Sequence, residues 1–87
     1  MTHYVVLFDY ALTDYGNSVT YNGVEVTGVV HSLEEAKEIL ANASVGEREY
    51  ATEHEWTICI DTDSEFVACE KDNYDNEHAH FYIQEIK

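Results

Sequence analysis

The sequence has 87 residues, of which 18 are Asp or Glu and only 4 are Lys or Arg, so its formal net charge is −14 at pH 7. A chain of this length forms one domain, which we expect to span residues 1–87. So few basic residues cannot neutralise a phosphate backbone, and an anionic membrane repels such a chain, which excludes direct binding to nucleic acid or membrane. Leu, Ile, Val and Phe make up 21 of the 87 residues, enough for a folded core rather than a disordered acidic chain.

The N-terminal segment lacks the features of a secretory signal. Met1 is followed by Thr-His-Tyr and a short apolar stretch, without a basic region or a long apolar one. No apolar run approaches the roughly 20 residues of a membrane span. The two cysteines, Cys59 and Cys69, have no CxxC or zinc-knuckle spacing and fit a reducing compartment. We therefore expect a cytoplasmic protein.

The first third of the chain predicts strands. Residues 4–8 are apolar at both parities, which predicts a strand at least partly covered on both faces. A turn is expected at residues 14–17. Residues 18–27 then alternate around Asn22-Gly23, and Asn-Gly is the strongest short hairpin signal because both residues tolerate positive φ. We expect a two-residue turn there, between two short strands.

A helix is predicted from about residue 32 to residue 43. Ser32-Leu-Glu-Glu35 has the pattern of a capping box, in which the Ser hydroxyl accepts a hydrogen bond from the amide of Glu35. We expect the helix to end between residues 41 and 46. For residues 45–54 we expect either a loop or a short further turn of helix. An apolar stripe at helical spacing is formed by Leu33, Ala36, Ile39, Leu40 and Ala43.

Three more strands are predicted in the second half. Residues 55–60 alternate, a turn follows at 61–64, and residues 65–70 form the return strand. A polar loop precedes the last strand at 79–86. The fold class is therefore α+β: a single antiparallel β-sheet of about five to six strands with one α-helix, at about 32–43, packed on one face.

The acidic residues gather on the predicted helix, in the middle of the chain, at the turn near residue 62 and in the last loop. In an extended segment, carboxylates at i and i+2 lie on one side about 6.6 Å apart, which resembles the anionic periodicity of a nucleic-acid backbone. A basic nucleic-acid groove on another protein would attract such a surface strongly. The alternative is a solvated acidic face that only keeps the protein soluble. The candidate partner-binding residues are Glu34, Glu35, Glu38, Glu47, Glu49, Asp61, Asp63, Glu65, Asp72, Tyr74, Asp75 and Glu77.

The tyrosines are a second informative set. Four lie in predicted strands and are expected to pack there: Tyr4, Tyr10, Tyr21 and Tyr82. Exposed aromatic rings among carboxylates suit a protein interface, which predicts a Tyr-rich patch or a sheet edge that binds a partner unrelated to nucleic acid as an alternative function. Three tyrosines fall in acidic, irregular stretches of that kind: Tyr15, Tyr50 and Tyr74.

Two patterns invite a metal-site interpretation. The Asp-x-Asp-x-Glu that begins at residue 61 fails as an EF-hand, because the sixth and twelfth positions hold Phe66 and Asp72 instead of Gly and Glu. His78 and His80, joined by His54 or Glu77, are a candidate zinc site. We predict no metal and no cofactor, and keep a small metal-binding protein that uses His78 and His80 as an alternative.

No catalytic constellation is recognisable. A reactive cysteine needs a base and positive surroundings, whereas Cys59 and Cys69 lie in a negative chain, so we expect two structural thiols that can be neighbours across a hairpin. The chain has no Gly-rich phosphate loop and no evident Ser-His-Asp arrangement, and a domain of this size rarely forms a deep cleft. We predict that the protein is not an enzyme.

In overall character the chain resembles the small acidic inhibitors that phages direct against bacterial defence, the anti-CRISPR and anti-restriction proteins, some of which mimic DNA. The resemblance rests on size, charge, a single α+β domain and the missing catalytic motif, and it carries no functional residue across. It implies a non-enzymatic inhibitor in the cytoplasm of an infected or host bacterium. The implied partner is a basic nucleic-acid-binding protein, such as a Cas effector or a restriction nuclease. Halophilic adaptation is a further explanation of the acidity, and it needs no partner.

Overall fold

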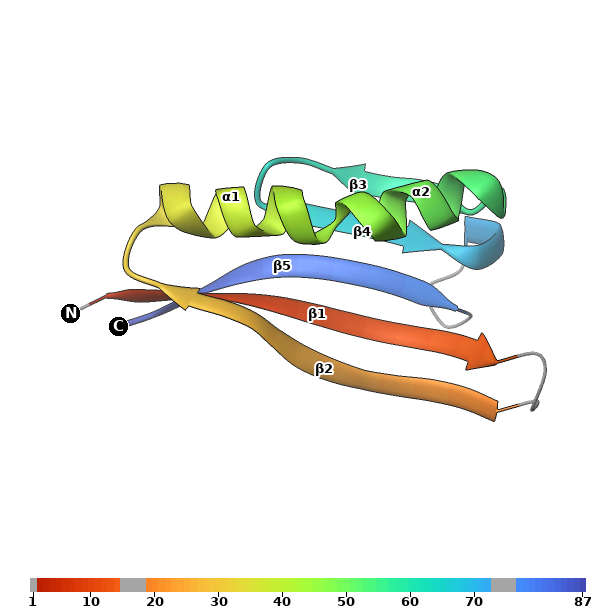
Figure 1. Ribbon diagram of the computed structural model, residues 1–87, viewed down its shortest axis with the longest axis horizontal. Helices are drawn as coiled ribbons and strands as arrows, with labels where there is room; N and C mark the ends of the chain where they lie inside the picture. The colour runs from red at the N-terminus through yellow and green to blue at the C-terminus, as the bar shows by residue number, and fades with distance from the viewer. Residues whose placement is uncertain (1, 15–18, 73–76) are drawn as a thin grey trace.

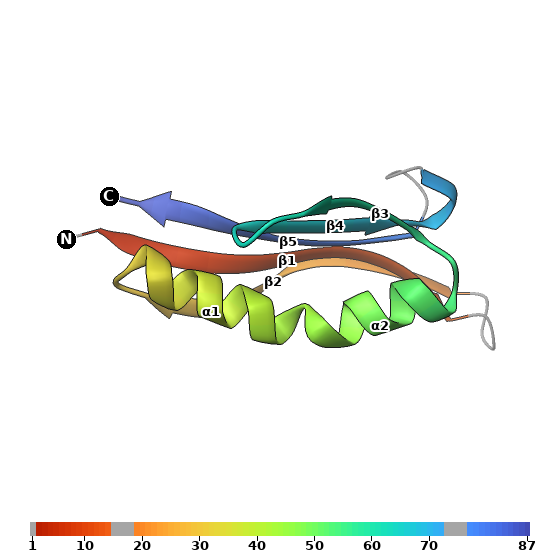
Figure 2. The same ribbon diagram turned by 90° about the horizontal axis from the view of Figure 1, so that it is seen from above.

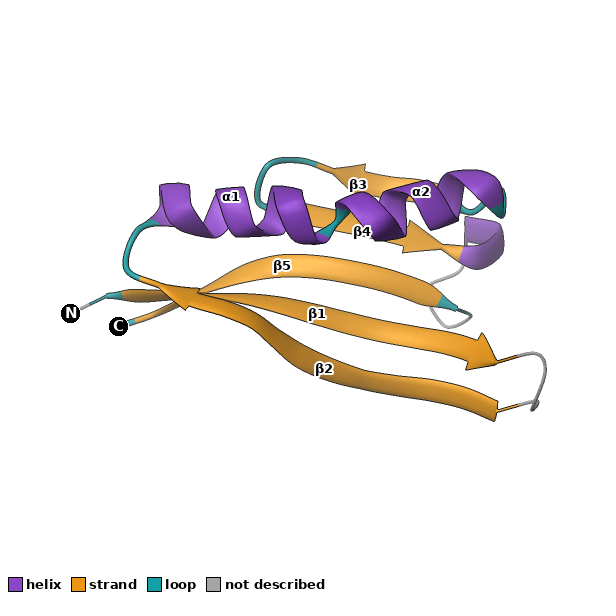
Figure 3. Cartoon of the chain, in the orientation of Figure 1, coloured by secondary structure: helices purple, strands orange, loops and turns teal. Residues whose placement is uncertain are grey.

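The computed structural model describes residues 2–14, 19–72 and 77–87. These residues form one five-stranded antiparallel sheet and one bent helix that lies across a single face of it (Figure 1). The two layers are plain when the helix and the strands are coloured separately (Figure 3). The predicted α+β class is confirmed, and the strand number is five. Neither described segment of the helix is long and apolar enough to cross a membrane.

The last strand lies in the centre of the sheet. The strand order is β2-β1-β5-β4-β3, and every neighbouring pair is antiparallel. β5 therefore joins the β1–β2 hairpin to the β3–β4 hairpin. His3 pairs with Ile86, which places both ends of the chain at the same end of the sheet (Figure 1). The strands are β1 (His3–Asp14), β2 (Val19–Val30), β3 (Thr57–Asp61), β4 (Glu65–Cys69) and β5 (His78–Ile86).

β2 is one continuous strand, so the prediction of a hairpin turn at Asn22-Gly23 is wrong. Neither residue has a positive φ, and they pair with Ala11 and Tyr10 of β1. The glycine serves the sheet in another way, because a Cβ on Gly23 would lie 3.2 Å from the Tyr10 hydroxyl. The tyrosine ring covers that position across the strands. The turn expected at 14–17 falls between β1 and β2, mainly outside the described residues.

The helix begins as predicted with α1 (Leu33–Ala43). The Ser32 hydroxyl accepts from the Glu35 amide at 3.2 Å and donates to the Glu35 carboxylate at 3.1 Å. The first of these bonds satisfies an amide at the helix start that has no partner within the helix. α1 ends at Ala43, within the predicted range of 41–46. The chain then continues as α2 (Val45–Glu53), which is longer than the short further turn of helix that the sequence allowed at 45–54.

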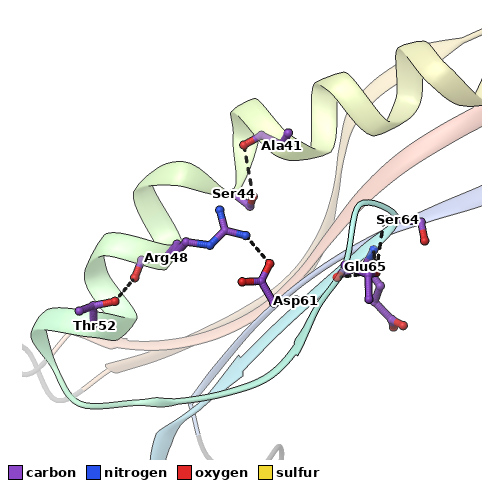
Figure 4. Close-up of polar contacts among 8 residues, drawn as sticks. Ala41, Ser44, Arg48, Thr52, Asp61, Ser64 and Glu65 are labelled. Atoms are coloured by element: carbon purple, nitrogen blue, oxygen red, sulfur yellow. Dashed lines mark hydrogen bonds and ion pairs between the residues drawn. The ribbon is translucent and has the colours of Figure 1, made fainter.

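Ser44 joins α1 to α2 and marks the bend. Its N–H donates to the Leu40 carbonyl at 3.0 Å, and its own carbonyl accepts from the Arg48 amide at 2.9 Å, so the helical hydrogen bonds run through it. The buried Ser44 hydroxyl donates to the Ala41 carbonyl at 3.3 Å (Figure 4). A back-bond of this type bends helices. α1 and α2 are therefore one bent helix that crosses the length of the sheet (Figure 2).

The core lies between this helix and the facing side of the sheet. The stripe predicted on the helix contributes Ala36 and Leu40, which are buried, while Leu33 is 39% exposed. Gly28 of β2 lets α1 approach closely, because a Cβ there would lie 2.9 Å from Cδ1 of Ile39. The central buried cluster is Val6, Ala36, Leu40, Ala51, Phe66, Ala68 and Phe81.

β3 is a short, exposed edge strand. Its pairing with β4 shifts between Ile58 and Ile60, which is a β-bulge at Cys59. The regular alternation predicted for residues 55–60 is broken there. Bulges and short length protect an edge strand from pairing with other chains, and β3 has both.

Candidate functional site

The outer face of the bent helix is acidic. A helix turns about 100° per residue, which places Glu34, Glu38, Glu49 and Glu53 within one arc of about 100° that points away from the core. Glu35 lies at the edge of the same arc, and all five side chains are exposed. We call these five residues the acidic helix face. It contains four of the predicted partner-binding residues and adds Glu53.

The two cations of the helix are turned to its flank, where they hold the β3–β4 hairpin. Nη2 of Arg48 lies 2.6 Å from Oδ1 of Asp61 (Figure 4), and its guanidinium carbon lies 4.8 Å from the centre of the Phe66 ring. Nζ of Lys37 lies 3.3 Å from Oδ2 of Asp63. The helix is described over its whole length, and no Lys or Arg lies on its acidic face.

The predicted acids of the β3–β4 hairpin are engaged within the molecule. Asp61 and Asp63 form the ion pairs with the helix, although the side chain of Asp63 stays 71% exposed. Oε2 of Glu65 lies 2.7 Å from Nε2 of His80 on β5. As binding residues for a partner, these three acids stay a prediction, and each would have to exchange an internal contact for an external one.

The remaining predicted residues are scattered. Glu47 is half-buried on the core side of α2, where burial raises the pKa of its carboxyl. Glu77 precedes β5 and is only 7% exposed. Of Asp72 the structure describes the backbone, at the end of the short 3₁₀ turn η1 (Glu70–Asp72). Tyr74 and Asp75 lie outside the described residues, as does Tyr15.

The histidines do not converge on one site. Nε2 of His78 lies 3.1 Å from Oδ1 of Asp9, whereas His80 contacts Glu65. The ring of His54 stacks on Tyr50 with 4.0 Å between ring centres. Within residues 2–14, 19–72 and 77–87, no three His, Cys, Asp or Glu side chains approach closely enough to hold a metal ion. The geometry therefore adds no support to the zinc alternative.

Cys59 and Cys69 are neighbours across the β3–β4 hairpin, as the sequence allowed. Their Sγ atoms lie 3.6 Å apart, and both are thiols. Cys69 is buried, whereas Cys59 is exposed at the bulge.

The sheet face away from the helix is apolar along β2. Val24, Val26 and Val29 are 57%, 63% and 58% exposed, and we call them the valine row. They pair with odd-numbered residues of β1, whereas the core residue Val6 is even-numbered. Side chains alternate between the two faces of a strand, so the three valines lie on the face away from the helix. β2 is a 12-residue edge strand whose single charged residue is Glu25. The described part of the molecule thus presents the acidic helix face on one side and the valine row on the other.

A pocket of about 310 Å³ lies where the end of α2 meets η1 and the start of β5. Its aromatic lining is Tyr50, His54 and Trp56. The Tyr50 and His54 rings stack, and Tyr50 and Trp56 meet edge to face at 5.3 Å and 83°. We call this cavity the aromatic pocket. Its charged lining is Glu55, Glu70, Lys71 and Glu77.

The end of α2 places the pocket residues. The N–H of Trp56 donates to the Ala51 carbonyl at 2.8 Å, five residues back along the chain. This is the 6→1 hydrogen bond of a Schellman motif. That motif needs a left-handed residue just before Trp56, and Glu55 supplies it with φ 60°. Glycine is preferred at such a position, whereas here the residue carries a carboxylate to the rim of the pocket.

The electrostatics of the pocket are negative. Burial raises the pKa of the Tyr50 hydroxyl, and the carboxylates of Glu77, Glu47 and Glu70 raise it further. Three carboxylates therefore act on one hydroxyl, which stays neutral. Lys71 is the one cation of the lining, so the formal charge of the lining is −2 when His54 is neutral.

Sequence reasoning did not bring these pocket residues together. It placed Tyr50 in an irregular stretch and considered His54 only as a metal ligand. The available signal was the i, i+4 spacing of Tyr50 and His54, which stacks two rings on a helix. That signal is usable only once residues 45–53 are recognised as helical.

The chain matches no protein-family model, and no curated protein or solved structure is similar enough to it to count as a match.

Proposed function

We propose that the protein is a non-enzymatic inhibitor that presents the acidic helix face to the basic nucleic-acid-binding groove of another protein, such as a Cas effector or a restriction nuclease. The observation that carries this proposal is the segregation of charge. The helix bears five of its six glutamates on one exposed face, all except Glu47, and turns both of its cations to the flank, where they pair with Asp61 and Asp63.

The dimensions of the acidic helix face suit a nucleic-acid groove. Glu34 and Glu53 are 19 residues apart along the bent helix, which corresponds to about 28 Å at 1.5 Å per residue. That length spans about eight base-pair steps of duplex. Within it, Glu34 and Glu38 form one i, i+4 pair and Glu49 and Glu53 another, each with Cβ atoms about 5–6 Å apart.

A face that serves only solubility has no reason to exclude cations. Interspersed charges of both signs keep proteins soluble without a large single-sign field. A single-sign face accelerates association with an oppositely charged groove and makes the binding dependent on salt. The segregated acids of the helix therefore favour a basic partner over solubility alone.

The test is competition with DNA on a panel of purified Cas effectors and restriction nucleases. We expect the protein to displace double-stranded DNA at low salt, with an affinity that falls steeply as NaCl rises. Glu34→Gln/Glu38→Gln and Glu49→Gln/Glu53→Gln should each lower the slope of log Kd against log salt by about one per lost contact.

The matched control is Glu25→Gln/Glu85→Gln, which removes the same charge from exposed positions outside the helix. It should change the affinity far less than either helix double variant. Affinity that is independent of salt, or a complex that still binds DNA normally, contradicts the proposal for that partner. Equal losses for the control and the helix variants would show a general effect of net charge instead.

The valine row favours a second candidate function, a protein-interaction module that binds a partner through β2. A long edge strand with one charge and three exposed valines can accept another strand through its backbone groups. Binding of this kind buries apolar surface and depends little on salt. Val26→Lys should abolish it and leave DNA competition through the helix intact.

A further inference from the structure

The aromatic pocket offers ring faces in two directions. Tyr50 stands at 83° to Trp56, so the two rings form a corner, and His54 stacks on one face of Tyr50 with 4.0 Å between ring centres. The face of an aromatic ring carries a partial negative charge, which attracts cations within about 6 Å of the ring centre. A corner of two rings contacts a rounded group on two sides at once.

Carboxylates complete the lining. Glu70 and Glu77 close one side of the pocket, where the Glu70 amide donates to the Glu77 carbonyl at 2.9 Å, and Glu55 stands exposed at the rim. The partly enclosed volume of about 310 Å³ lowers the local dielectric response, which strengthens the attraction for a cation. Lys71 is the one lining residue that would attract an anion, and the formal charge of −2 therefore favours a cation.

We propose that the aromatic pocket binds a methylated ammonium group, either on a small free molecule or at the end of a trimethylated lysine side chain. Rings and carboxylates together favour a cation that also has apolar surface. The described carboxylates do not gather into a metal-ligand cluster, so a bare metal ion would leave the rings unused. A planar guanidinium stacks on one face, whereas a rounded methylated ammonium contacts both rings of the corner. The proposal does not depend on the acidic helix face.

The pocket contains its own reporter, because Trp56 is the only tryptophan of the chain. We would titrate the full-length protein with choline at constant ionic strength and follow tryptophan fluorescence. Saturable binding in about the millimolar range is expected for a pocket of this size. The uncharged isostere 3,3-dimethylbutan-1-ol should bind about tenfold more weakly, since it keeps the shape and loses the charge.

Two exposed rim residues should change the affinity in opposite directions. Glu55→Gln removes a negative charge and should weaken choline binding about threefold, whereas Lys71→Met removes the competing cation and should tighten it about threefold. Glu85→Gln lies outside the pocket and should leave the affinity unchanged, as should Glu34→Gln/Glu38→Gln. A retained affinity in this last variant separates the pocket from the function proposed for the helix.

Tyr50 supplies a matched pair for the ring. Tyr50→Phe keeps the aromatic face and should bind choline about as well as the original protein, whereas Tyr50→Leu should bind about fivefold more weakly, with circular dichroism as the control for folding. A comparison of choline with Nα-acetyl-trimethyllysine amide identifies where the methylated ammonium group comes from. Tighter binding of the lysine derivative would indicate a protein side chain, and tighter binding of choline would indicate a small free molecule.

Three results with these ligands would overturn the proposal. They are a linear, non-saturable response to choline, equal affinity for the uncharged isostere, and tighter binding of Nα-acetyl-arginine amide than of the trimethyllysine derivative. Unchanged affinity in both Glu55→Gln and Lys71→Met would likewise show that the cation binds elsewhere.

Discussion

Two glycines show how differently one residue type is used in this fold. A Cβ on Gly28 would lie 2.9 Å from Cδ1 of Ile39, whereas a Cβ on Gly46 meets nothing within 4 Å. Gly46 lies inside α2 without a positive φ, where glycine only adds freedom to the unfolded chain. We expect Gly46→Ala to stabilise the protein by about 0.5–1 kcal/mol and Gly28→Ala to destabilise it by about 1–3 kcal/mol. Urea unfolding measures both, and a stabilised Gly28→Ala variant would show that α1 does not press on β2.

Glu47 makes a prediction about pH. Burial raises the pKa of its carboxyl above the ordinary value of 4.5, so folding favours the protonated form. The stabilising contribution is present below the unfolded pKa and is lost as the pH rises through the folded pKa. Glu47→Gln stays neutral, so it should gain stability over the original protein more at pH 7 than at pH 4. The measurement is the difference between their urea midpoints at each pH. A difference that does not change with pH contradicts the assignment.

For the helices and strands, the sequence predicted correctly those boundaries that depend on neighbouring residues and failed where contacts with distant strands determine the structure. The start of α1 was predicted correctly, because the Ser32 cap lies within one turn and needs no other part of the chain. Asn22-Gly23 failed because all of β2 pairs with an equally long β1, and Tyr10 covers Gly23. α1 ends at Ala43 as predicted, but the helical state of residues 45–53 stayed open in the sequence, because the bend at Ser44 depends on its burial and on its bond back to Ala41.

Two ion pairs join the bent helix to the β3–β4 hairpin, and we expect them to differ in strength. Arg48 combines a 2.6 Å contact to Asp61 with a position over the Phe66 ring, whereas Lys37 reaches an Asp63 that is mostly in solvent. In double-mutant cycles we expect a coupling of about 0.5–1 kcal/mol for Arg48 and Asp61 and about zero for Lys37 and Asp63. The variants Arg48→Met, Asp61→Asn, Lys37→Met and Asp63→Asn supply the cycles. Equal couplings would mean that the Phe66 ring does not hold the guanidinium in place.

The candidate sites were predictable to different degrees. The acidic helix face follows from spacing alone up to residue 43, and its continuation to Glu53 needed the helix to pass Ser44. The aromatic pocket was out of reach, because α2, η1 and the residue before β5 are brought together only by the sheet order. The internal pairing of Asp61 and Asp63 was hidden for the same reason.

For the whole molecule, a net charge of −14 sets the response to salt. The Debye length falls from about 30 Å at 0.01 M to about 10 Å at 0.1 M, so repulsion among the acids weakens mostly within that range. We expect the thermal midpoint to rise as NaCl is added, with the steepest part below about 0.1 M. Glu34→Gln/Glu38→Gln should flatten the rise more than Glu25→Gln/Glu85→Gln, because its charges are clustered. A protein that folds only in molar salt would instead support halophilic adaptation.

The central place of β5 also determines when the fold can form during synthesis. The ribosome makes the β1–β2 hairpin, then the bent helix, then the β3–β4 hairpin. None of these connects the two hairpins into one sheet, because β5 lies between β1 and β4. Only β5 pairs with both hairpins, and its Phe81 belongs to the buried cluster, so the sheet and its complete core form only after residues 78–86 are made. Because Glu77 directly precedes that strand, the aromatic pocket is completed in the same step. A ribosome that stalls before this strand would therefore hold a chain without its complete sheet, with its core residues exposed to proteases.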